Sequence, residues 1–267
     1  MGISKGAVTL LGMSLQQVDR AGSVITFGVQ KVHASYHDAR QRFSRAGIAA
    51  APIEHTGSGN LHQEVLFRML GYDTVESLDY YAAEGPTHVH DLNRPVPEAL
   101  RERFDLVYDG GTTEHCFSVP ECLSNAVRLA RNGGRIIHHL PLNNWVDHGF
   151  YQFSPGLFFD FYEANGFDEL SLWLHFMTGR KESFIAYDPR TDDRLAYQLG
   201  GSANVLAFFS ARKSRVADTI VFPVQGRYRR TFGGEADRHA TPRKRSRVSR
   251  LRRSIMKRTL RLRAKPC

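Results

Sequence analysis

Residues 104–141 read FDLVYDGGTTEHCFSVPECLSNAVRLARNGGRIIHHLP, and they carry the clearest structural pattern in the chain. The apolar run at residues 104–108 predicts a buried strand, which ends in an acid and two glycines. A capping box, Ser118 with Glu121 three residues later, and a Gly133-Gly134 end predict the helix that follows. A second apolar run, residues 135–138, predicts another strand. The stretch is therefore expected to form a strand–helix–strand unit with a right-handed crossover.

Short apolar runs alternate with helix-like segments on both sides of this unit, which is the pattern of a parallel sheet covered by helices. The seven runs predicted as strands are residues 24–27, 75–78, 87–90, 104–108, 135–138, 170–174 and 204–209. A further helix is predicted from Ser154-Pro155 to Gly166, and shorter helical pieces near residues 36–46 and 62–70. We expect an α/β domain over residues 23–215, preceded by a helical segment at residues 1–22.

The residues that follow each predicted strand form a chemically coherent set. In chain order they are Gly28, Asp79, Asp91, Asp109 with Gly110 and Gly111, and Asn143 with Asn144. In an open parallel sheet the ligand lies beyond the carboxyl ends of the strands. A carboxylate at the end of the second strand, Asp79, is suited to accept hydrogen bonds from a ribose diol. Glycine at the end of the first strand lets a ligand approach the backbone closely.

The stretch that begins at residue 104 resembles the fourth strand, helix and fifth strand of the class I S-adenosylmethionine-dependent methyltransferases. These commonly read Phe-Asp-Leu-Val, a short loop, Leu-Glu-His and a helix with a Gly-Gly end. The matching positions are Phe104, Asp105, Glu114, His115, Leu129, Gly133 and Gly134, and weaker similarity extends over residues 23–210. The chain is most similar to a bacterial subgroup associated with surface-glycan pathways, which has an Asp-Gly-Gly-Thr fourth loop and an Asn-Asn-Trp fifth loop.

The resemblance implies a Rossmann-like, seven-stranded, mostly parallel sheet with helices on both faces, and S-adenosylmethionine as cofactor. The cofactor-binding positions that it implies are Gly28, Gln30, Asp79, Asp91, Asp109, Gly110 and Gly111. The chain departs from the family after the first strand, where the usual acid-x-Gly-x-Gly-x-Gly loop is reduced to Gly28, with Gln30 at the place of the second glycine. A Gly/Ser-rich segment, HTGSGN at residues 55–60, is a candidate source of the missing flexible backbone.

Candidate catalytic residues lie where an acceptor should bind. Methyl transfer to an oxygen requires removal of a proton, and the candidate bases are His115 after the fourth strand and Asp147 and His148 after the fifth. Neighbouring residues in an extended segment point to opposite faces, so Asp147 and His148 are not assumed to pair. The candidate substrate-binding residues are Asn143, Asn144, Trp145 and Tyr151, with aromatic rings that stack on a sugar or pack in the core. The spacing of His, Cys and Asp predicts no metal site.

The net charge of +9 is concentrated at one end of the chain. Residues 238–267 contain thirteen Lys and Arg and no acid, which leaves 23 basic and 27 acidic residues before them. We interpret residues 216–237 as a linker and residues 238–267 as a basic tail. Within residues 241–265, apolar residues recur at helical spacing, which suits an amphipathic helix on an anionic membrane. The same charge suits RNA, and a solvated, disordered tail remains open.

The rest of the composition bears on the compartment. Three cysteines, Cys116, Cys122 and Cys267, are too few for a disulfide framework, and the first 25 residues lack the order of a signal peptide. No apolar run is long enough to span a bilayer. We therefore expect a cytoplasmic chain with free thiols, peripheral at the inner membrane face if it meets a membrane.

Three functions remain open at this point. The first is an S-adenosylmethionine-dependent methyltransferase that methylates an oxygen of a sugar, glycan precursor or other small acceptor. The second is a non-catalytic binding or scaffold protein of the same fold. The third is a nucleic-acid methyltransferase guided by the basic tail, against which the absence of an Asn/Asp-Pro-Pro-aromatic tetrad counts.

Overall fold

The computed structural model describes residues 2–16, 18, 20–55, 57–179, 181–191, 201–215 and 219–233. The chain divides into two compact units, Met1–Gly226 and Arg227–Cys267. Helix α6 (Gly226–Phe232) begins at the boundary, within the stretch predicted as a linker. The predicted basic tail, residues 238–267, lies outside the described residues. In the part of the chain that is described, no helix has the length and apolar character needed to cross a membrane.

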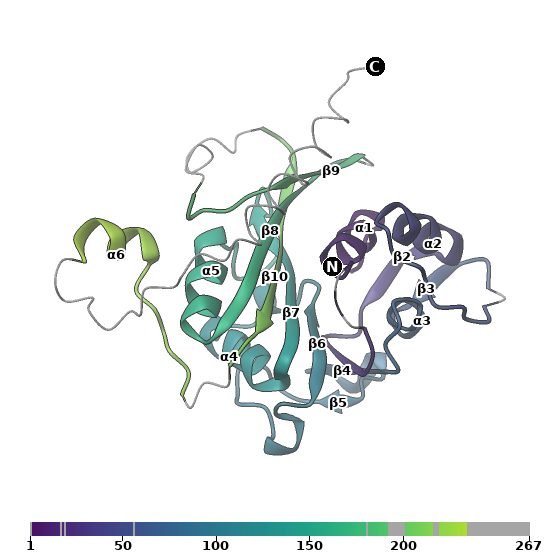
Figure 1. Ribbon diagram of the computed structural model, residues 1–267, viewed down its shortest axis with the longest axis horizontal. Helices are drawn as coiled ribbons and strands as arrows, with labels where there is room; N and C mark the ends of the chain where they lie inside the picture. Colours follow the sequence, from purple (N-terminus) through teal and green to yellow (C-terminus); the bar gives the residue numbers. More distant parts are fainter. Residues whose placement is uncertain are drawn as a thin grey trace. The chain divides into compact units, whose positions relative to one another are not determined.

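The described residues of the first unit are built around one eight-stranded sheet of order β5-β4-β1-β6-β7-β10-β8-β9 (Figure 1). Its strands are β1 (Ser23–Phe27), β4 (Thr74–Asp79), β5 (His88–Val89), β6 (Phe104–Asp109), β7 (Ala130–Asn143), β8 (Phe167–Thr178), β9 (Lys181–Ala186) and β10 (Asn204–Lys213). Strands β5, β4, β1, β6 and β7 pair in parallel, whereas β10 is antiparallel to both β7 and β8. The predicted Rossmann-like, mostly parallel sheet is confirmed, but it has eight strands rather than the predicted seven, because β9 adds an edge strand.

The order of the parallel strands creates a switch point. From β1 the chain proceeds outward through β4 and β5 on one side, and it then returns to β6 and β7 on the other. In open α/β sheets the crevice beyond the carboxyl ends of the strands at such a point is where ligands bind. The residues that follow β1, β4 and β6 lie at this switch point.

All seven predicted strands lie in the sheet, and the structure adds three that the sequence did not predict. Strand β9 forms the sheet edge beside β8, and its burial alternates residue by residue. Strands β2 (Lys31–Ser35) and β3 (Asn60–His62) pair with each other in a separate two-stranded sheet. Asn60, the last residue of the Gly/Ser-rich segment, begins β3 opposite Ser35, at the end of β2 that is farther along the chain from Gly28.

Helices lie on both sides of the large sheet, as predicted (Figure 1). Helices α4 (Val119–Leu129) and α5 (Pro155–Ala164) lie on one side, and α1 (Lys5–Ser14), α2 (Tyr36–Arg45) and α3 (Gln63–Met69) lie on the other. Helix α5 begins at Ser154-Pro155 as expected and buries Phe158 and Phe161, whereas Leu157 is exposed. Phe158 stacks on Phe209 of β10, so that aromatic rings fill the space between helix and sheet.

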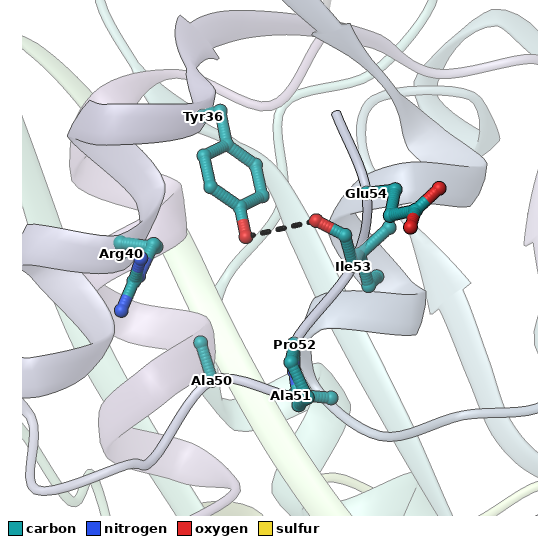
Figure 2. Close-up of a pocket in the computed structure, with 7 residues that line it drawn as sticks. All are labelled: Tyr36, Arg40, Ala50, Ala51, Pro52, Ile53 and Glu54. Atoms are coloured by element: carbon teal, nitrogen blue, oxygen red, sulfur yellow. Dashed lines mark hydrogen bonds between the residues drawn. The ribbon is translucent and has the colours of Figure 1, made fainter. Parts of the chain in front are cut away.

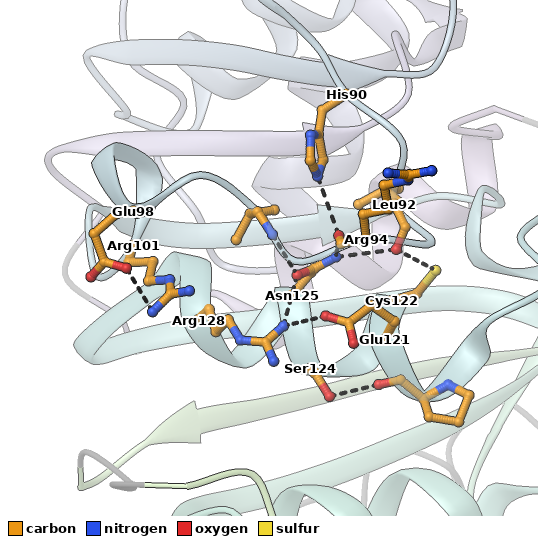
Figure 3. A network of polar contacts seen from close by, with 12 residues as sticks. His90, Leu92, Arg94, Glu98, Arg101, Glu121, Cys122, Ser124, Asn125 and Arg128 are labelled. Atoms are coloured by element: carbon orange, nitrogen blue, oxygen red, sulfur yellow. Dashed lines mark hydrogen bonds and ion pairs between the residues drawn. The ribbon is translucent and has the colours of Figure 1, made fainter.

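The capping box predicted for α4 is wrong. The Ser118 side chain makes no capping hydrogen bond, and the Glu121 carboxylate accepts from Arg128 two turns along the helix instead (Figure 3). The bond to the guanidinium joins two opposite full charges, whereas the capping box would have paired the carboxylate with a neutral N–H. Helix α4 also ends at Leu129 rather than at the glycine pair, because β7 already begins at Ala130.

Candidate functional site

The carboxyl ends of β1, β4 and β6 are joined by hydrogen bonds. The N–H of Gly28 donates to the carbonyl of Leu78 on β4 at 2.8 Å. The Thr112 hydroxyl, from the loop after β6, donates to the carbonyl of Phe27 at 2.8 Å. The site at the switch point is therefore a single connected unit, in which the loops after three strands are in contact.

Gly28 has a local structural reason to be glycine. Its φ of +71° lies in the left-handed region, which is costly for other residues. A Cβ at this position would lie 2.9 Å from Oγ1 of Thr112 and 3.5 Å from Oδ2 of Asp79. The β1 turn thus lies directly against the two loops that the sequence predicted to bind the cofactor.

Gln30 fills the space between β1 and the loop after β6. Its side chain is buried, and its Nε2 donates to the carbonyl of Phe27 at 2.6 Å. Its Oε1 has no hydrogen-bond partner among the described residues, and it lies 2.3 Å from the position that a Cβ of Gly110 would take. Gly110 is therefore required for close approach, as Gly111 is by its φ of +99°. The carboxamide stands where the resembling family has a second glycine.

Asp79 lies at the end of β4, half-buried beside the β1 turn. Its Oδ2 accepts from the N–H of Val29, and its Oδ1 accepts from the N–H of Tyr81, both at 3.3 Å. Each carboxylate oxygen can accept further hydrogen bonds, so the group retains capacity for a diol. The next two residues, Tyr80 and Tyr81, are exposed and meet edge to face with centroids 4.7 Å apart. Asp79 thus has the position and the free lone pairs that are expected of a residue that binds a ribose.

Asp91 follows β5 and forms a tight turn with Asn93. Its Oδ1 accepts from the backbone N–H and the side-chain amide of Asn93, and the backbone bond is the main cause that lowers the pKa of Asp91. The loop is tied to α4 through the Asn125 amide, which donates to the carbonyls of Leu92 and Arg94 (Figure 3). Helix α4 therefore fixes this side of the site.

Asp109 is buried, and its carboxylate is directed into the protein. Its Oδ1 accepts from the N–H groups of Thr112 and Thr113, and its Oδ2 from the Thr113 hydroxyl at 2.6 Å. Oδ2 also lies 2.9 Å from Nδ1 of His138, whose Nε2 lies 2.5 Å from the Tyr162 hydroxyl. The carboxylate thus holds the Gly110-Gly111 loop in place. His138 is thus a buried core histidine with a partner at each ring nitrogen.

The three remaining ionisable residues of the site come from two loops. Glu114 and His115 lie on η3 (Thr113–His115), and His148 lies in the loop after β7. Nε2 of His148 is 3.8 Å, and Nε2 of His115 is 3.9 Å, from Oε1 of Glu114. Burial, together with the nearby charge of Asp109, raises the pKa of Glu114 to about 8. Burial lowers the pKa of both histidines.

The sequence did not select Glu114 as a functional residue, although it counted the residue as part of the family match. The sequence feature that could have identified Glu114 is its position between Thr113 and His115, in the loop after a strand that ends at the switch point. His148 lies close to Glu114 because the N–H of Phe150, two residues later in the same loop, donates to the carbonyl of Glu114 at 2.8 Å. Asp147 is exposed with a φ of +59°, and no hydrogen bond joins it to His148 in the described part of the chain.

The residues predicted to bind substrate hold the loop after β7. The Asn144 side chain donates to the carbonyls of Gly201 and Ala203, and the Trp145 indole donates to the carbonyl of Val205 at 3.1 Å. The Tyr151 hydroxyl donates to the carbonyl of Phe117 at 2.9 Å. Asn143 ends β7 opposite Val205. The ring centroids of Trp145 and His148 lie 4.9 Å apart, so an aromatic side chain of this loop packs beside the ionisable cluster.

A cavity of about 270 Å³ lies elsewhere, between α2 and residues 50–54 (Figure 2). Tyr36 forms one wall, and its hydroxyl donates to the carbonyl of Ile53 at 3.2 Å. Arg40 lies over the same ring at 5.9 Å. No residue that the sequence predicted for the site lines this cavity, so we assign it no part in the candidate site.

Comparison with known proteins gives matches among solved structures only. No family model and no curated protein matches the chain. A possible histamine N-methyltransferase from Thermotoga maritima is 14% identical with a TM-score of 0.37, over 77% of this chain and 89% of that one. An Archaeoglobus fulgidus S-adenosylmethionine-dependent methyltransferase is 12% identical with a TM-score of 0.43, over 78% and 92%. A Haemonchus contortus phosphoethanolamine N-methyltransferase, with S-adenosylhomocysteine bound, is 12% identical with a TM-score of 0.42, over 78% and 53%.

Proposed function

We propose that the chain is an S-adenosylmethionine-dependent methyltransferase that acts on an oxygen of a small acceptor, such as a sugar or a glycan precursor. The observation that carries the proposal is the position of Asp79. Its carboxylate ends β4 beside the Gly28 turn, at the switch point of a Rossmann-like sheet, where such an acid binds a ribose diol. The cofactor has a ribose of this kind.

The residues at and just after the strand ends fit the cofactor in four respects. Asp79 would hold the ribose hydroxyls, and the backbone of Gly28 and Val29 would lie along the methionine part. The loop of Gly110 and Gly111 brings backbone without side chains to the same place. The unpartnered Oε1 of Gln30 would accept from the ammonium group of the cofactor. When bound, the cofactor supplies a methyl group on a positively charged sulfur.

The protein must align the acceptor and accept its proton. The cluster of Glu114, His115 and His148 lies beside the switch-point loops, at the place where proton removal is expected. Burial lowers the pKa of both imidazoles, so both are neutral near pH 7 and have a free lone pair. Asp147, the third predicted catalytic residue, remains a candidate through its exposed carboxylate on the same loop.

Aromatic side chains support a sugar-like acceptor. Phe117 and Phe150 are exposed and meet edge to face with centroids 5.9 Å apart. Tyr151 and Trp145 lie on the same loop as Phe150 and complete a surface suited to the apolar face of a sugar ring. We assign acceptor binding to this surface, together with Asn143 and Asn144 at the loop base.

One observation favours a non-catalytic scaffold protein as the second candidate. The buried Gln30 carboxamide occupies the space beside Gly110 that the family keeps open for its cofactor. In that case, the fold would bind a partner without transferring a methyl group.

Calorimetric titration of the full chain with S-adenosylmethionine and S-adenosylhomocysteine tests the proposal. Wild-type protein should bind both at micromolar concentrations, and Asp79→Asn should lose at least tenfold in affinity. Asp73→Asn is the matched control, because Asp73 precedes the same strand at its opposite end and accepts from the N–H of Gly22. No binding at millimolar ligand would refute the methyltransferase and favour the scaffold.

A further inference from the structure

We infer that Glu114, His115 and His148 form a binding site for a divalent transition-metal ion. Each residue offers one ligand atom, and the three atoms lie within 4.8 Å of one another. Oε1 of Glu114 lies 3.8 Å from Nε2 of His148 and 3.9 Å from Nε2 of His115. Metal–ligand distances in such sites are about 2.1 Å, so one ion can bridge two atoms up to about 4.2 Å apart, and both Glu114–histidine pairs are within this limit.

The Glu114 carboxylate supplies an independent reason for a cation. The side chain is 0% exposed, and no other described residue donates a hydrogen bond to Oε1 or Oε2. Buried polar groups in folded proteins almost always have partners, and a buried carboxylate without one is costly. Nε2 of His148 is buried and unpartnered in the same way. An ion between them would satisfy both groups.

The backbone positions this carboxylate and the His148 imidazole before any ion binds. The carbonyl of Glu114 accepts from the N–H of Phe150, which fastens the loop after β7 to η3. A Cβ on Gly149 would lie 2.8 Å from the same carbonyl, so glycine allows the two segments to meet. The loop is also held at its start by Asn144 and Trp145. The ligands thus come from two segments that are already joined.

The ligand atoms and their exposure indicate the kind of ion. Two imidazole nitrogens with one carboxylate suit zinc, iron, cobalt or manganese rather than magnesium or calcium. The carboxylate is buried, whereas the His115 and His148 side chains are 44% and 30% exposed. Because Nε2 of His148 is itself buried, open coordination positions would lie on the His115 side, which is the most exposed of the three. A site with open positions is the kind that binds a substrate oxygen, in contrast to a closed structural site.

This location defines a role that rests on the proposed function. An acceptor hydroxyl bound to the ion would lose its proton more readily, with the proton passing to solvent. The resulting alkoxide would attack the methyl carbon of the cofactor. The bond between carbon and sulfur breaks as the bond between oxygen and carbon forms, leaving a neutral thioether and a methyl ether. The imidazoles would then act as ligands rather than as the base itself.

The test uses the full chain without a polyhistidine tag, treated with chelator and titrated with Zn²⁺ and Co²⁺ by calorimetry. One equivalent should bind with micromolar or tighter affinity, and the Co²⁺ form should develop visible absorption bands. Glu114→Gln and His148→Gln should each weaken binding at least tenfold. His88→Gln is the matched control, because Nε2 of His88 meets Oε2 of Glu76 at 2.6 Å and the described residues offer no third ligand there. Equal binding by wild type and Glu114→Gln would overturn the inference.

Thermal unfolding separates loss of the site from loss of the fold. Zn²⁺ should raise the Tm of wild-type protein by several degrees and leave that of Glu114→Gln unchanged. Without metal, Glu114→Gln should be at least as stable as wild type, because the substitution removes an unpartnered buried carboxylate. A metal-independent Tm in wild type would count against the site. All these titrations omit S-adenosylmethionine, so a failure of cofactor binding leaves the metal result intact, and the reverse also holds.

Discussion

Oδ2 of Asp109 lies 2.9 Å from Nδ1 of His138, and both side chains are fully buried at the carboxyl end of β6. The same carboxylate accepts three hydrogen bonds from Thr112 and Thr113. The histidine continues the chain to the Tyr162 hydroxyl on α5. One carboxylate therefore connects the loop that carries Glu114 to the helix that covers the sheet.

Replacement of His138 should destabilise the protein strongly. In His138→Leu, the Asp109 carboxylate and the Tyr162 hydroxyl each lose a buried hydrogen-bond partner, and each buried polar group left unsatisfied costs about 1–3 kcal/mol. Tyr162→Phe removes only the last hydrogen bond and should cost about 1 kcal/mol. Urea unfolding of the two variants measures both values. Similar losses in the free energy of unfolding of the two variants would show that burial of the Asp109 carboxylate does not depend on His138.

Two other buried histidines predict how stability varies with pH. Nε2 of His139 lies 3.0 Å from Nδ1 of His175, and Oε2 of Glu182 lies 3.9 Å from Nε2 of His175. Burial lowers the pKa of His175 to about 4 and that of His139 well below its usual value. Below pH 6.5 the unfolded chain therefore binds protons that the folded chain does not, and the free energy of unfolding falls as pH falls.

The expected slope between pH 6.5 and 4 is up to about 1.4 kcal/mol per pH unit for each histidine. Thermal or urea unfolding at a series of pH values measures it. His175→Asn should reduce the slope, because one of the two groups no longer titrates. An unchanged slope in this variant would assign the acid sensitivity to other groups, such as the carboxylates common to both proteins.

The strands of the sheet could be predicted because burial on both faces leaves continuous apolar runs, as in residues 104–108 and 204–209. Strand β9 could not, since it lies at an edge and reads KESFIA, with alternating burial and a charged beginning. Strands β2 and β3 are short, and they can be recognised as strands only from their pairing with each other.

The strand-end residues of the site followed from chain order alone, because the carboxyl ends of parallel strands meet at one edge. The contact between Glu114 and His148 could not be predicted from the order of the strands. It depends on the return of the loop after β7, which is set by the bond from Phe150 to Glu114 and by the Asn144 side chain. A loop path of this kind is decided by tertiary hydrogen bonds, which residue spacing does not encode.

Substitution of Gly28 should separate backbone strain from steric contact. Gly28→Ala places a Cβ 2.9 Å from the Thr112 hydroxyl at a positive φ, whereas Gly85→Ala has a φ of +66° and no atom within 4 Å. Positive φ costs about 1–2 kcal/mol in both, and crowding should add about 1–3 kcal/mol in Gly28→Ala alone. Equal free energies of unfolding for the two variants would mean that the Thr112 loop moves away without cost.

The basic tail should govern attachment to membranes. Removal of residues 238–267 deletes thirteen positive charges and should abolish sedimentation with vesicles that contain anionic lipid. Affinity for S-adenosylmethionine should not change, since every strand-end residue lies before residue 226. The same deletion assayed against RNA tests the nucleic-acid alternative. If full-length protein binds RNA and not vesicles, the membrane proposal fails.

Gln30 distinguishes an enzyme from a scaffold protein at a single position. If its unpartnered Oε1 accepts from the cofactor ammonium group, Gln30→Ala should weaken S-adenosylmethionine binding about tenfold, which corresponds to about 1.4 kcal/mol. Gln63→Ala is the control for general loosening, because Oε1 of Gln63 accepts from the backbone N–H of Gln30 at 2.7 Å without reaching the strand ends of β4 and β6. If Gln30→Ala instead gains affinity, the carboxamide blocks the cofactor site, as a non-catalytic protein of this fold requires.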